Sequence, residues 1–120
     1  MTKALKFDGS PQSSDRLRFL HHGLCQSPKA QQPREIEVLR REGSLIKRLE
    51  AVSVPDPAVQ PGGRWQFIPR CITQPGEVFV EQADLNLLRD YVLAMPWSPM
   101  VAEVVVDAVE WALGAPEAKV

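Results

Sequence analysis

The sequence has no uncharged apolar run of about 18 residues, which a membrane-spanning helix requires, and this absence excludes a transmembrane segment. Residues 1–8 also lack the apolar core of a secretory signal, so we expect a cytoplasmic protein. Only two cysteines occur among the 120 residues, too few for a disulfide scaffold. In the cytoplasm we expect both as thiols.

Catalytic motifs are missing as well. The chain has no Gly-rich phosphate loop, no Gly-x-Ser-x-Gly nucleophile turn and no dinucleotide-binding fingerprint. We therefore expect a protein that is not an enzyme, with no catalytic residues and no cofactor. The formal net charge is only −1, so the chain as a whole does not resemble a basic nucleic-acid coat.

Hydrophobic residues make up 44% of the chain and charged residues 24%, values typical of a globular domain. The small net charge conceals a division along the chain. The first fifty residues carry ten Lys and Arg against six Asp and Glu, whereas the remaining seventy carry four against nine. A basic half is thus joined to an acidic half, and the two halves are expected to meet different partners.

Eleven prolines, about twice the average share, divide the chain into short blocks. A Gly-Ser-Pro-Gln stretch near the start indicates that residues 1–12 form a flexible N-terminal arm. We expect a single globular domain over residues 13–114 and a frayed C-terminus over residues 115–120.

Apolar residues recur at helical spacing in four segments, which predict helices at residues 15–22, 34–52, 84–95 and 99–113. Ser13 or Ser14 is expected to cap the first helix, and Gly23 to end it. Gly43 interrupts the second, which is therefore either one kinked helix or two short ones.

A strand is expected at 64–72, where aromatic and polar residues alternate, and a second strand at 77–82. The Pro-Gly pair between them has the chemistry of a type II turn. We therefore predict an antiparallel hairpin in which Arg70 faces Glu81. The predicted fold class is α+β, with about four helices packed on this hairpin.

Two cysteines and a histidine are weak candidates for a zinc site. His21 and Cys25 are four residues apart, a helical spacing that would place both on one face, and Cys71 could join them around zinc. The paired ligands typical of zinc sites are missing, and a buried structural role for Cys25 is the alternative. Cys71 follows Arg70 and could also be considered as a nucleophile, although an ordinary cysteine in a strand explains it equally.

A basic segment around Gly43 has the outline of a helix-turn-helix reader of nucleic acid. Its cationic residues are Arg34, Arg40, Arg41, Lys47 and Arg48. Four glutamates in the same segment dilute this charge, so a solvated helix with internal ion pairs is the alternative.

The final predicted helix is the most apolar element, and its acidic residues Glu103, Asp107 and Glu110 form one narrow stripe. An apolar helix with so little polar surface favours contact with a second subunit. The expected interface residues, on helices 84–95 and 99–113, are Leu88, Tyr91, Val101, Val105 and Trp111. We therefore predict a small protein-interaction module, an adaptor, accessory subunit or regulator, that forms a homodimer. A nucleic-acid-binding regulator is the alternative.

Overall fold

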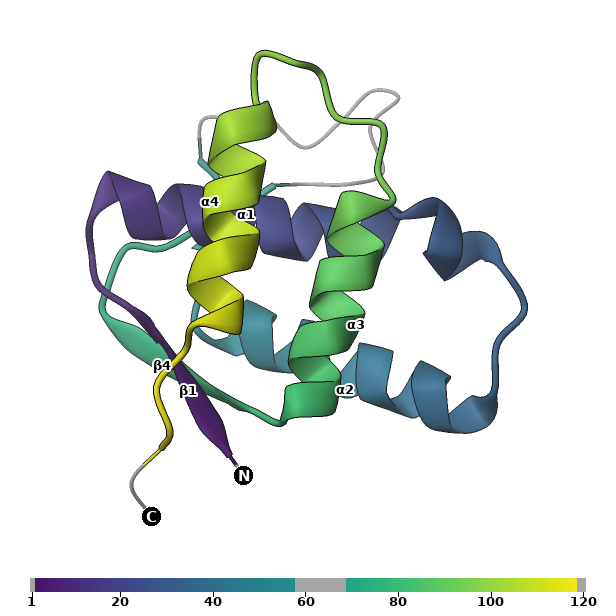
Figure 1. Cartoon of the computed structure of the whole chain (residues 1–120). Helices are drawn as coiled ribbons and strands as arrows, with labels where there is room; N and C mark the ends of the chain where they lie inside the picture. The colour runs from purple at the N-terminus through teal and green to yellow at the C-terminus, as the bar shows by residue number, and fades with distance from the viewer. Residues whose placement is uncertain (1, 58–68, 119–120) are drawn as a thin grey trace.

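The computed structural model describes residues 2–57 and 69–118 and has an α+β fold with two small antiparallel sheets. Helix α1 crosses behind α3 and α4, which lie side by side (Figure 1). The elements are β1 (Lys3–Phe7), α1 (Pro11–Gln26), the 3₁₀ helix η1 (Pro28–Gln31), α2 (Ile36–Ala51), β2 (Val54–Pro55), β3 (Arg70–Cys71), β4 (Gly76–Val80), α3 (Gln82–Leu93) and α4 (Ala102–Leu113).

Helix α1 is longer at both ends than the prediction of residues 15–22. Ser10 caps it by accepting a hydrogen bond from the backbone N–H of Ser13 at 3.2 Å, and Pro11 occupies the first helical position. Both residue types favour a helix start, so the true cap lies three residues before Ser13. The helix packs against α2, α3, α4 and β3 and is the central element of the fold.

Gly23 lies inside α1 and does not end it, contrary to the prediction. A Cβ atom placed on Gly23 would lie 2.6 Å from Cγ2 and 2.9 Å from Cα of Val92 on α3. Side-chain carbons do not approach a backbone that closely in folded proteins. Glycine is therefore required because α1 and α3 cross in contact at this point.

The predicted flexible arm contains a core strand. In β1, Leu5 and Phe7 are buried, and the strand pairs with β4 in a register that joins Leu5 to Val78. A five-residue strand with apolar side chains on its inner face gains enough buried surface to offset the ordering of the chain end. The Gly-Ser-Pro stretch that suggested disorder serves instead as the turn into α1.

Residues 116–118, within the predicted frayed C-terminus, pair with the start of the chain. The backbone N–H of Ala4 donates to the carbonyl of Pro116, and that of Ala118 donates to Thr2, each at 2.9 Å. Lys3 and Glu117 form an antiparallel bridge. The C-terminal segment therefore follows the edge of β1 that β4 leaves open, and the two chain ends hold each other in place.

The predicted hairpin does not form, although residues 64–68 lie outside the described part. β4 pairs with β1, and β3 pairs with β2, so Arg70 lies opposite Pro55 and not opposite Glu81. A type II turn splays adjoining strands, which disfavours a tight hairpin here. β1 supplies five consecutive partners for β4 and no proline interrupts it.

The other three helices are present with shifted ends. Helix α2 continues unbroken through Gly43, so the single-helix alternative is confirmed. Helix α3 begins two residues earlier than predicted. Helix α4 begins three residues later, because residues 99–101 form a turn in which Val101 N–H donates to the Ser98 carbonyl.

Within the described residues, no helix has the length and apolar character required to cross a bilayer.

We predict opposite effects for alanine at two helical glycines. Gly23→Ala should destabilise the fold by about 2 kcal/mol, because the added methyl group must push α1 away from Val92. Gly43→Ala should stabilise it by up to about 1 kcal/mol, because a Cβ there meets nothing within 4 Å. Urea denaturation of both variants measures the free energy of unfolding. Equal effects would contradict the close crossing.

Candidate functional site

Helix α2 carries a carboxylate within its apolar face. Glu42 is only 8% exposed. Arg34 donates to both of its carboxylate oxygens at 2.7 Å, and the Tyr91 hydroxyl of α3 donates to Oε2 at 3.0 Å. Burial and this bond to Glu42 raise the pKa of Tyr91. Glu42, Arg34 and Tyr91 thus form hydrogen bonds with one another. These bonds hold α2 against α3 in a defined orientation.

A second buried carboxylate lies at the start of α3. Asp84 is 2% exposed, and its Oδ2 accepts a hydrogen bond from the backbone N–H of Glu81 at 2.8 Å. Arg41 donates to Oδ1 at 2.9 Å and Arg48 to Oδ2 at 3.4 Å, both from α2. A buried carboxylate without a counter-charge would destabilise the fold, so Asp84 requires the positive charges of these two arginines beside it.

These contacts divide the five cations of the predicted nucleic-acid site into two groups. Arg34, Arg41 and Arg48 are bound to buried carboxylates of the chain itself. Arg40 and Lys47 lie on the exposed side of α2 and make no ion pair within the described residues. The structure therefore does not gather the five as one basic surface.

Arg40 and Lys47 border a shallow groove on the outer side of α2. We call it the α2 groove, lined by Leu39, Arg40, Gly43, Ser44, Lys47, Arg48 and Ala51. Its surface is more apolar than polar, since Leu39 is 45% exposed and Gly43 adds no side chain. Ile36, 60% exposed, lies one helical turn beyond Leu39.

The predicted pair His21 and Cys25 does meet in space. His21 Nε2 lies 3.6 Å from Cys25 Sγ and 3.5 Å from Glu50 Oε1. Both contacts use the same ring nitrogen, whereas activation of a thiol by an oriented imidazole uses one nitrogen for the thiol and the other for the carboxylate. Burial lowers the pKa of His21 and raises the pKa of Cys25 to about 11, which favours the neutral form of each. This arrangement does not generate a thiolate nucleophile.

Cys71 does not join that pair in any recorded contact. It lies on β3, opposite Val54 of β2. Among residues 2–57 and 69–118, no three or more His, Cys, Asp or Glu side chains are grouped so that they could hold a metal ion. The structure thus provides no zinc site from His21, Cys25 and Cys71.

The residues predicted to form a dimer interface belong to the core of the monomer. Leu88, Tyr91 and Val105 are buried, and Val101 and Trp111 pack against them while partly exposed. Their side chains pack against other elements of the same chain, and Tyr91 donates a hydrogen bond to Glu42 on α2. Trp111, for example, stacks with Phe7 at a centroid distance of 5.0 Å.

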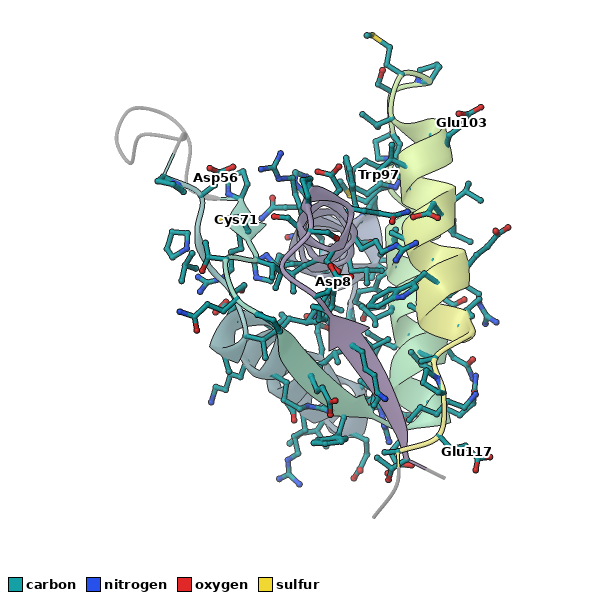
Figure 2. All side chains as sticks on the ribbon, turned by 90° about the vertical axis from the view of Figure 1, so that its left-hand side faces the viewer. Asp8, Asp56, Cys71, Trp97, Glu103 and Glu117 are labelled. Atoms are coloured by element: carbon teal, nitrogen blue, oxygen red, sulfur yellow. The ribbon has the colours of Figure 1, made fainter. Side chains whose placement is uncertain are left out.

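The outer side of α4 carries acidic residues instead. We call it the α4 outer face, lined by Ala102, Glu103, Val106, Asp107 and Glu110. Asp107 accepts from Arg16 Nε at 3.0 Å, and Arg16 lies over the Trp111 ring. Glu103 and Glu110 are exposed, with no ion pair among the described residues, and Glu103 points away from the molecule (Figure 2).

Comparisons of the chain with protein-family models, with curated proteins and with solved structures found no match. Function must therefore be argued from the surfaces of this chain alone. Among the described residues, the α2 groove and the α4 outer face each combine exposed apolar side chains with charges of one sign that make no ion pair.

We predict that the two groups of cations on α2 differ in their effect on stability. Replacing Arg41 and Arg48 together with Gln should cost about 3 kcal/mol of unfolding free energy, because Asp84 is then left buried without a counter-charge. The matched change of Arg40 and Lys47 to Gln should stay within about 0.5 kcal/mol. Thermal and urea denaturation distinguish the two, and equal losses would contradict this division.

Proposed function

We propose that the chain is a non-enzymatic protein-interaction module that binds a helical segment of a partner in its α2 groove. The observation that carries the proposal is the exposure of Ile36 and Leu39 beside two uncompensated cations. Large aliphatic side chains at helical spacing on a surface are the usual anchors of a helix-in-groove contact. Scattered exposed apolar residues are ordinary, but these two are adjacent turns of one helix.

The charges of the groove specify the kind of partner. Arg40 and Lys47 lie on either side of Gly43 along α2, so a bound segment meets positive charge on both sides of that position. A partner helix with apolar residues on one side and carboxylates beside them would satisfy both features. Electrostatic attraction of this type mainly increases the rate of association and the selectivity for acidic partners.

Nucleic-acid binding remains the alternative, with less support. Phosphate recognition depends on several cations that release counterions together. Three of the five candidates are held by Glu42 and Asp84, which leaves Arg40 and Lys47 for a phosphate backbone. Exposed aliphatic side chains in the groove favour a protein partner over a polyanion.

Fluorescence anisotropy with a labelled synthetic helix tests the proposal. The probe carries leucines along one side and glutamates beside them, and its control carries lysines in place of the glutamates. We expect the acidic helix to bind at least about tenfold more tightly than the basic one, since like charges repel across the groove. Mixed-sequence DNA and RNA in the same low-salt buffer test the alternative.

Matched variants test whether the acidic helix binds in the α2 groove. Changing Arg40 and Lys47 to Gln should weaken acidic-helix binding about tenfold, and Leu39→Ser should weaken it similarly. The same neutralisation of two exposed lysines elsewhere, Lys6 and Lys29, should leave it nearly unchanged. Equal binding of the acidic and basic helices, or tighter binding of nucleic acid than of either, would contradict the proposal.

A further inference from the structure

The outer sides of α2 and α4 carry opposite charges at the same spacing. Arg40 and Lys47 are seven residues apart on α2, and Glu103 and Glu110 are seven residues apart on α4. Seven residues are about two helical turns, or roughly 10 Å along the axis. Two helices aligned side by side can therefore bring both cations opposite both carboxylates.

The side chains between the charges also match in size. When Arg40 is aligned with Glu103 and Lys47 with Glu110, the position of Gly43 coincides with that of Val106. Val106 is 45% exposed, while a Cβ on Gly43 would meet nothing within 4 Å. A valine on one helix would thus fill the space that a glycine leaves on the other.

One molecule cannot make this contact with itself. Helix α4 forms the right-hand edge of the view in Figure 2, and α2 lies toward the lower left. Helix α2 packs on α1, α3 and β4, and α4 packs on α1 and α3, so both helices cover a common core from different sides. Their outer sides point away from that core and from each other.

We propose that the α4 outer face of one copy of this chain occupies the α2 groove of the next copy. This inference rests on the proposed function, because it names the partner of the same groove. The contact is heterologous, joining different surfaces of two identical molecules. Since the two surfaces lie on opposite sides, it builds open chains or rings and not the symmetric dimer that the sequence suggested.

The strength of the contact follows from its exposed position. Ion pairs at a surface contribute little individually and are screened by salt. We expect association at roughly 100 µM protein in low salt, weakened at least about tenfold when the salt is raised to about 0.5 M. The species should grow beyond the dimer as concentration rises.

Sedimentation velocity on three charge-reversed chains tests the contact. The α2-reversed chain carries Arg40→Glu and Lys47→Glu, and the α4-reversed chain carries Glu103→Arg and Glu110→Lys. Each should be monomeric where the wild type associates, a loss of at least about tenfold in the association constant. A chain with all four changes should associate again, because its charges are exchanged and remain complementary. Circular dichroism confirms that each variant is folded.

Mixing the two reversed chains gives the sharpest result. In the mixture the normal α4 outer face of one chain meets the normal α2 groove of the other, and the two charge-reversed surfaces are complementary to each other as well. The mixture should therefore associate and grow, although each reversed chain alone stays monomeric. Association through a surface that contains none of these four residues would not depend on mixing the two chains.

Several outcomes would overturn the inference. A wild-type chain that stays monomeric in low salt excludes self-association, and association that both reversals leave intact assigns it to another surface. If the acidic synthetic helix still binds to the monomeric chain, the proposed function stands and only the partner is wrong. If that helix and a second copy both fail to bind, both proposals are lost.

Discussion

The structure depends on two buried carboxylates, which are neutralised by arginines on α2 and just before it. Glu42 and Asp84 lie in the seam between α2 and α3, where an unpaired charge would be costly. Arg34 holds the first, and Arg41 and Arg48 hold the second. Because these contacts need specific sides of α2 to face α3, they also fix the rotation of α2 about its own axis.

That rotation determines what the molecule presents to its surroundings. While these arginines reach the buried carboxylates, the outer side of α2 presents aliphatic, small and cationic residues, Arg48 itself included, and these residues line the α2 groove. The groove is therefore a consequence of how the buried carboxylates are satisfied. Any change that rotates α2 would alter the core and the groove together.

The opposite charges of the two chain halves follow the same principle. Arg16 pairs with Asp107 and Arg18 with Asp56, and α2 supplies the arginines that reach Asp84. The basic half is thus partly neutralised by the acidic half within one molecule. The exposed charges on the outer sides of α2 and α4 are among those that make no ion pair within the described residues.

Periodicity predicted the helices well because an amphipathic helix repeats its apolar side locally. It could not predict strand partners, since β4 could pair with any strand and the nearest in sequence was not the one chosen. The sequence predicted that Gly23 ends the first helix. Its actual role, a close crossing of α1 and α3, depends on Val92, which is distant in the sequence. These errors concern contacts between residues far apart in the chain.

The candidate site was only partly predictable for a similar reason. The sequence identified the basic residues in and before α2. Separating those that pair with buried carboxylates from those that stay exposed required knowledge of which carboxylates are buried. One signal was available, because Glu42 falls in the apolar stripe, four residues after Val38 and three before Leu45. A carboxylate at such a position indicates a buried partner. For Asp84 the nearby helix start offered a capping role but no hint of two arginines.

The most direct test of the account is a two-dimensional ¹⁵N NMR spectrum of the wild type recorded as its concentration rises in low salt. The account predicts that amide signals change on two separate surfaces at once, the α2 groove and the α4 outer face, and that added salt reverses both. Changes confined to one surface, or centred on other residues, would contradict it.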